Sequence, residues 1–216
     1  MNITEEWRYE DAPKLIVLTG NGRREFKIAK AIGEKYDGEP VFFPIGIPLG
    51  RKTKKFTGLS VLSAVPILHR IYGVNRFLII MDKEHIPEKI DSIIRNYGIV
   101  PTKIERKTEQ VLFIECMIDG QEILVIIAIS GAKSSLEEDR SRFIFYRFGD
   151  SVPPDKNQIK QYYKRRNLNE LEEIRRTKRE ILEKAFPGLT EAFKLLEQSI
   201  KTKHSLLDKN NRYNHK

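Results

Sequence analysis

Arg76-Phe-Leu-Ile-Ile-Met-Asp-Lys-Glu84 is the stretch that decides the fold of this chain. Its unbroken apolar run, Phe77–Met81, predicts a strand covered by protein on both faces, because a half-exposed strand would alternate apolar and polar residues. Ligands of such sheets bind outside the carboxyl ends of the strands, which is where Asp82 and Glu84 fall. The two carboxylates are therefore candidate ligands of a divalent cation. The alternative is that they are solvated acids at the start of the next helix.

The segments around this strand alternate between strand and helix patterns. Two apolar runs, 110–118 and 121–129, are joined by Asp119-Gly120, which is typical of a two-residue hairpin turn. Further strands are predicted at 14–18 and 40–45, and helices at 23–32, 58–71, 87–97 and 136–148. This order predicts an α/β fold with a mainly parallel, Rossmann-like sheet flanked by helices, to which a β-hairpin and a C-terminal helical extension are added.

The clearest boundary is Asp150-Ser-Val-Pro-Pro-Asp155, which separates an α/β domain at 1–150 from a basic helical extension at 151–207. Residues 208–216 are expected to form a flexible polar tail. Within the extension we predict a basic helix at 158–166, a helix that begins at Asn169 and runs to Ala185 along one apolar face, and a last helix at 190–207.

The positive charge of the chain is concentrated near its C-terminus. The 216 residues have a formal net charge of +9, and residues 151–216 hold 16 Lys and Arg against 9 Asp and Glu. A surplus of 7 positive charges in this last part favours a polyanionic partner such as nucleic acid.

Several classes of protein are excluded by composition. The single cysteine, Cys116, rules out an intramolecular disulfide and a cysteine-based zinc cluster, and its apolar neighbours favour burial. There is neither a signal-peptide pattern nor an apolar run as long as a membrane span. We therefore expect a soluble, cytoplasmic protein without membrane contact.

Acidic residues follow three of the predicted strands. Glu25 comes after the glycine turn of the first strand, Asp82 and Glu84 end the central strand, and Glu137 and Glu138 follow the hairpin. Carboxylates from different strand ends meet at one edge of a parallel sheet, where oxygen ligands favour Mg²⁺ (or Mn²⁺). Such a cation activates water and neutralises the charge that develops on a phosphodiester.

With these motifs, the chain resembles the Toprim (topoisomerase–primase) domain. It is closest to small standalone archaeal and bacterial proteins related to the overcoming-lysogenization-defect nucleases. The matching segments are Val17-Leu-Thr-Gly-Asn-Gly-Arg-Arg-Glu25, Ile80-Met-Asp-Lys-Glu84, Gly131…Leu136-Glu-Glu-Asp139 and Phe186-Pro-Gly-Leu-Thr-Glu-Ala192. The resemblance implies a metal-dependent nuclease. Thr19 stands where the family has its first glutamate, and the nearest acid, Glu25, lies two residues further into the helix than the family pattern places it.

Basic residues near these acids are candidate contacts for nucleic-acid phosphates. The candidates are Arg23, Arg24, Arg51, Lys52, Lys54, Lys55, Lys164, Arg165 and Arg166. Tyr162 and Tyr163, beside the last three, are candidates for stacking on bases.

Three functions are consistent with the sequence. The first is an Mg²⁺-dependent enzyme acting on nucleic-acid phosphodiesters, in which Asp82 and Glu84 hold the metal, Glu137 or Glu138 assists, and Glu25 is the general base. The second is a Toprim-fold protein that binds nucleic acid or a protein partner without cleavage. The third is a nucleotide-binding regulatory protein that uses the turn Thr19-Gly-Asn-Gly22.

Overall fold

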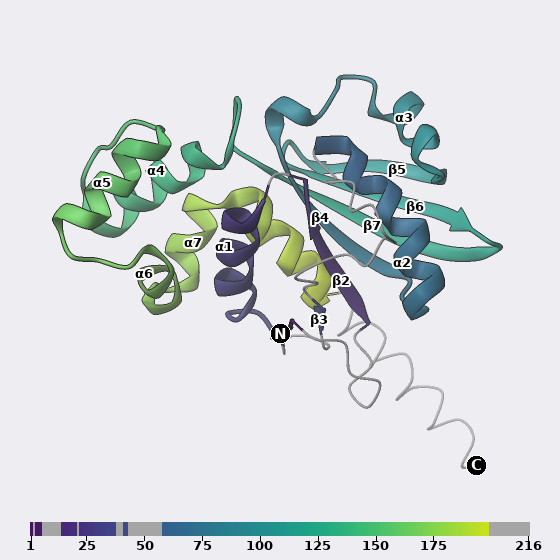
Figure 1. Cartoon of the computed structure of the whole chain (residues 1–216), viewed down its shortest axis with the longest axis horizontal. Helices are drawn as coiled ribbons and strands as arrows, with labels where there is room; N and C mark the ends of the chain where they lie inside the picture. The colour runs from purple at the N-terminus through teal and green to yellow at the C-terminus, as the bar shows by residue number, and fades with distance from the viewer. Residues whose placement is uncertain (2, 6–13, 21, 38–40, 43–57, 199–216) are drawn as a thin grey trace, which may run out of the picture.

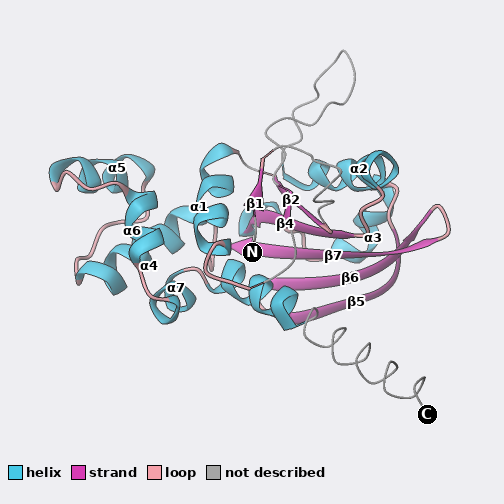
Figure 2. Ribbon diagram, turned by 90° about the horizontal axis from the view of Figure 1, so that it is seen from below, coloured by secondary structure: helices cyan, strands magenta, loops and turns pink. Residues whose placement is uncertain are grey.

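The structure, a computed structural model, describes residues 1, 3–5, 14–20, 22–37, 41–42 and 58–198 (Figures 1 and 2). Its described strands form one sheet in the order β1-β3-β2-β4-β7-β6-β5. The first five strands in this order are mutually parallel, β6 is antiparallel to β7, and β5 is antiparallel to β6. The strands are β1 (Ile3–Thr4), β2 (Leu15–Thr19), β3 (Val41–Phe42), β4 (Arg76–Asp82), β5 (Val100–Thr108), β6 (Val111–Ile118) and β7 (Gln121–Ser130).

Helices cover both faces of the sheet, as Figure 2 shows. One face carries α1, α6, α7 and the helical residues 187–198, and the other carries α2 and α3. The helices are α1 (Arg23–Gly33), α2 (Ala64–Tyr72), α3 (Ile90–Ile93), α4 (Leu136–Phe148), α5 (Lys156–Arg165), α6 (Glu170–Arg176) and α7 (Arg179–Ala185). The predicted α/β class, with an open mixed sheet between helices, is confirmed.

The central strand β4 has the double coverage that its apolar run predicts. Leu78 and Ile80 point into the cluster beneath α1, while Phe77, Ile79 and Met81 point into the cluster beneath α2. All five side chains have 0% exposure. Burial of this kind contributes about 1.5–3 kcal/mol for each large apolar side chain.

The hairpin is also confirmed. Asp119 and Gly120 both have positive φ, 51° and 79°, which a two-residue turn of the mirror-image type requires. Cys116, which precedes the turn on β6, is buried with 1% exposure, as its apolar neighbours predict.

The structure differs from the sequence prediction at β5 and at the end of α6. β5 was not predicted, because it is an exposed edge strand with mostly polar residues. The single helix expected from Asn169 to Ala185 is two helices, since Thr177 is extended (φ −79°, ψ 143°) and its hydroxyl donates to the Glu173 carbonyl at 2.6 Å. Of the strand predicted at 40–45, the structure describes only Val41 and Phe42.

The C-terminal helices belong to the main core. Leu182, Phe186 and Phe193 join Leu78 and Ile80 of β4 in one buried cluster. α7 and the helical residues 187–198 therefore pack on the sheet face beside α1, whereas α5 packs against α4 in a separate small cluster (Figure 1). Among the described residues, no helix combines the length and apolarity needed to cross a membrane.

Candidate functional site

The middle of the sheet contains a topological switch between β2 and β4. The strands are parallel neighbours, with Thr19 paired to Ile80, yet the helices that follow them, α1 and α3, pack on opposite faces. Ligands of open α/β sheets bind outside the carboxyl ends of the strands at such a switch. The candidate site therefore lies beyond Thr19 and Asp82.

Glu25 turns back from α1 towards the end of β2. The Thr19 hydroxyl donates to Glu25 Oε2 at 2.5 Å, and only 7% of Glu25 is exposed. The first turn of a helix stabilises a negative charge, because its backbone N–H groups are oriented towards it. The acid that the sequence places in the helix thus has its carboxylate beside Thr19, the residue that ends the strand.

Asp82, the last residue of β4, is a buried carboxylate with 7% exposure. Burial raises the pKa of Asp82 to about 6, although the Leu136 backbone N–H donates to its Oδ1 at 3.0 Å and opposes the shift. The negative charges of Glu137 and Glu84 raise this pKa further. Asp82 therefore lies between the end of β4 and the start of α4, where the negative charges of Glu84 and Glu137 influence its protonation.

Glu84 lies in the short 3₁₀ turn Lys83–His85 that follows Asp82. Its backbone N–H donates to the Ser134 carbonyl at 3.0 Å, which fixes the turn against the segment before α4. Its side chain is 55% exposed and lies 3.9 Å from the ring of His85. The carboxylate of Glu84 is consequently open to solvent and to a ligand.

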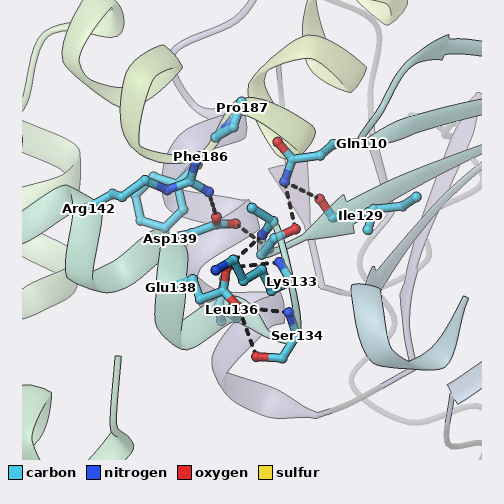
Figure 3. Close-up of polar contacts among 12 residues, drawn as sticks. Gln110, Ile129, Lys133, Ser134, Leu136, Glu138, Asp139, Arg142, Phe186 and Pro187 are labelled. Carbon is cyan, nitrogen blue, oxygen red and sulfur yellow. Dashed lines mark hydrogen bonds and ion pairs between the residues drawn. The ribbon is translucent and has the colours of Figure 1, made fainter. Parts of the chain in front are cut away.

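Glu138, in the first turn of α4, uses its carboxylate to accept hydrogen bonds from the backbone of the preceding turn (Figure 3). Its carboxylate accepts hydrogen bonds from the backbone N–H groups of Ala132, Lys133 and Ser134 at 2.7–3.0 Å and from the Ser134 hydroxyl at 2.9 Å. Burial alone would raise the pKa of Glu138, but these hydrogen bonds hold it below its usual value. Its role in this structure is to shape the turn between β7 and α4.

The next acid, Asp139, is fully buried and also serves this turn. It accepts a hydrogen bond from the Gly131 N–H at 3.1 Å and pairs with Arg142, as Figure 3 shows. Burial raises the pKa of Asp139 to about 7, and the charge of Arg142 opposes the shift. Of the three acids that open α4, Glu137 and Glu138 are half-buried, and the Glu137 side chain has 24% exposure.

Asp82, Glu84 and Glu137 are the acids that suit a metal ion. They supply carboxylate oxygens, which hard divalent cations prefer. Among the described residues, no three His, Cys, Asp or Glu side chains are arranged closely enough to hold a metal ion. Mg²⁺ is usually held by one or two carboxylates, with water and phosphate oxygens as the other ligands.

The basic residues predicted to bind nucleic acid fall in three places. Arg23 is exposed in the first turn of α1, and Lys164 and Arg165 are exposed at the end of α5. Arg24 forms an ion pair with Glu170 of α6. Outside the described residues lie four of the predicted cations, Arg51, Lys52, Lys54 and Lys55.

The two tyrosines at the end of α5, predicted to stack on bases, differ in exposure, since Tyr162 is half-buried and Tyr163 is buried. Tyr163 is buried, with 5% exposure. Tyr162 donates its hydroxyl to Asp150 at 2.7 Å, and the guanidinium of Arg166 lies 4.9 Å from its ring centroid while pairing with Asp150 at 2.8 Å. The prediction that both tyrosines stack on bases is therefore wrong for Tyr163, because its ring packs in a small core with Ile144 and Ile159.

Three basic residues near Arg24 and Lys164 were missed from the sequence. Lys156, Lys160 and Arg140 line the same pocket as these two residues. The spacing of Lys156, Lys160 and Lys164, four residues apart on a predicted helix, was the available signal, since such residues share a face. Nothing in the sequence placed Arg140 beside them.

Comparisons with protein-family models, curated proteins and solved structures find no match to this chain. The likeness to the Toprim domain therefore rests on the motifs within the sequence.

Proposed function

We propose that this protein is a Toprim-like, Mg²⁺-dependent enzyme that hydrolyses phosphodiester bonds in nucleic acid. The observation that supports this most is the position of Asp82. It is a buried carboxylate at the switch between β2 and β4, and the charges of Glu84 and Glu137 act on it. Clustered acids at the ligand-binding end of a parallel sheet are expected where a cation is bound.

Asp82 and Glu84 would supply the carboxylate ligands of the metal ion, and Glu137 would assist through its negative charge rather than as a third ligand. Glu138 is not assigned to this role, because its oxygens accept four hydrogen bonds from the preceding turn. A bound Mg²⁺ would supply charge neutralisation at the phosphate and a more acidic water. Leu136 N–H keeps the Asp82 carboxylate in position through its hydrogen bond to Oδ1.

Glu25 would act as the general base. Its carboxylate is oriented by the hydroxyl of Thr19, which donates to Oε2. A carboxylate at this strand end takes a proton from an attacking water when that water lies within hydrogen-bond reach. Thr19 then has a positioning role, and its replacement by Val would remove the hydrogen bond while keeping a similar side-chain volume.

The test is an assay of labelled single- and double-stranded DNA and RNA with Mg²⁺ or Mn²⁺. We expect product with at least one substrate, loss of product in EDTA, and loss of product in Asp82→Asn. Glu122→Gln, a change at an exposed residue of β7, is the matched control and keeps activity. Absence of product from the whole panel contradicts the proposal, as does product undiminished in Asp82→Asn.

A second candidate is nucleic-acid binding without cleavage. It is favoured by Thr19, which occupies the end of β2 where the Toprim motif has an acid, and by the use of Glu138 for the backbone. Binding that weakens with salt but survives both EDTA and Asp82→Ala, without product, supports this candidate. Absence of binding at low salt rules it out.

A further inference from the structure

A basic pocket of about 420 Å³ lies between α1, α4, α5 and the start of α6. Its charged lining consists of five cations and one acid. The cations are Arg24, Arg140, Lys156, Lys160 and Lys164, and the acid is Glu170. Like charges around a hollow repel one another, so this arrangement favours an anion in the pocket.

Glu170 does not neutralise the lysines. It is buried, with 1% side-chain exposure, and accepts hydrogen bonds from Arg140 Nε at 2.7 Å and Nη2 at 3.0 Å. Arg24 pairs with the same carboxylate. Lys156, Lys160 and Lys164 form no ion pair with any residue that the structure describes. Glu170 thus orients the guanidinium groups of Arg24 and Arg140. The ammonium groups of the three lysines remain available to bind an anionic ligand.

Tyr163 gives an independent indication of a ligand. It also lines the pocket, is 5% exposed, and its hydroxyl has no hydrogen-bond partner among the described residues. Arg140 and Arg24 both act on this hydroxyl electrostatically. Because neither guanidinium can accept a hydrogen bond, the phenol lacks an acceptor. A buried polar group without a partner costs about 1–3 kcal/mol, and an anionic oxygen would supply the acceptor.

We propose that this pocket binds a phosphate group carried by a nucleotide or by the end of a nucleic-acid strand. Two arginines already oriented by Glu170, three unpaired lysines and a phenol donor match the several acceptor oxygens of a phosphate. A volume of about 420 Å³ is also within the usual range for small-molecule sites.

Two arginines of the pocket adjoin the proposed catalytic acids, but none of those acids lines the pocket. Arg24 is followed by Glu25, and Arg140 bonds both Glu170 of the pocket and Glu137 of the site. The inference extends the proposed function by naming where a phosphate is held, and it stands if the protein does not cleave nucleic acid.

Calorimetry in EDTA at low salt tests the inference separately from hydrolysis. The probes are inorganic phosphate, a nucleoside 5′-monophosphate, and one oligonucleotide with either a 5′-phosphate or a 5′-hydroxyl. We expect the wild type to bind at least one phosphate monoester. If the phosphorylated oligonucleotide binds tighter than its hydroxyl form, a strand end is the source, and if the mononucleotide binds as tightly, a free nucleotide is.

Variants locate the binding. The double variant Lys160→Gln/Lys164→Gln should weaken binding at least tenfold, and Tyr163→Phe about fivefold, since it removes a hydrogen-bond donor. Lys184→Gln, an exposed change on α7 that removes one positive charge outside the pocket lining, is the surface control and keeps binding. Asp82→Asn should also bind phosphate normally while losing cleavage, which separates the two proposals. No binding by the wild type, or an equal loss in Lys184→Gln, overturns the assignment.

Discussion

Arg140 of α4 joins two carboxylates from different parts of the molecule. Its Nε lies 2.7 Å from Glu170 Oε1, while its Nη1 lies 3.3 Å from Glu137 Oε1. The buried guanidinium of Arg140 therefore connects Glu137, one of the acids near Asp82, with Glu170 in the lining of the basic pocket.

We predict that Arg140→Gln destabilises the protein by about 3 kcal/mol, because it leaves the buried Glu170 with Arg24 as its remaining partner. Urea unfolding measures this change. Arg175→Gln is the control, because the Arg175 side chain is 44% exposed and its partner Glu34 is 37% exposed, so this ion pair lies at the surface. The control should lose no more than about 0.5 kcal/mol. Equal effects in the two variants would show that burial of the Arg140 pair contributes nothing.

Asp82→Asn should stabilise the metal-free protein at pH 8. The folded-state pKa of about 6 lies above the ordinary 3.8, so the folded protein holds the proton more tightly than the unfolded chain does. Stability of the wild type therefore falls as the pH rises from 3.8 to 6 and stays reduced above that. Asparagine carries no charge, and its Oδ1 can still accept from Leu136 N–H.

The expected gain is at most about 3 kcal/mol at pH 8, since each pKa unit between 3.8 and 6 corresponds to about 1.36 kcal/mol, and the gain should disappear near pH 4. Unfolding in EDTA at both values measures it. A gain that does not change with pH would mean that the charge of Asp82 is not the cause.

Gly188→Ala should destabilise the protein, although alanine is the better helix former by about 1 kcal/mol. A Cβ at this position would lie 2.1 Å from the Ile129 carbonyl oxygen at the end of β7, which is backbone and cannot move aside freely. Thermal unfolding measures the effect. Lys184→Ala, at an exposed position of α7, is the control, and a higher melting temperature for Gly188→Ala would refute this close approach.

Cys116 should react slowly with thiol reagents in the folded state. Burial raises the pKa of its thiol to about 11, and 1% of the residue is exposed. The thiolate is the reactive form. We expect reaction with an aromatic disulfide at pH 8 to be at least about 100-fold slower than in denaturant. Similar rates in the two conditions would contradict burial of β6 in the core.

Elements with a strong local pattern were predictable from the sequence. The run Phe77–Met81 gave the central strand, and Asp119-Gly120 gave the hairpin, because each pattern has a direct physical cause in burial or backbone conformation. β5 was missed because an edge strand needs no apolar face. The break at Thr177 was missed because the apolar periodicity continues through it.

The site was less predictable than the fold, since hydrogen-bond partners far apart in the sequence decide what each acid does. Glu137 and Glu138 are adjacent in the sequence, yet Glu137 pairs with Arg140 and its charge raises the pKa of Asp82, while Glu138 accepts hydrogen bonds from the turn before α4. Arg140 and Glu170 are thirty residues apart, and no pattern links them. The burial of Tyr163 likewise depends on packing between α4 and α5.

The central claim is that Asp82 supports metal-dependent hydrolysis, and the most direct measurement is the rate of oligonucleotide cleavage with excess enzyme. With Mg²⁺ at pH 8, we predict that Asp82→Asn lowers the rate at least about 100-fold, which corresponds to nearly 3 kcal/mol of transition-state stabilisation. Glu122→Gln should cleave at the wild-type rate. Equal rates for the wild type and Asp82→Asn, or cleavage that persists in EDTA, would contradict the claim.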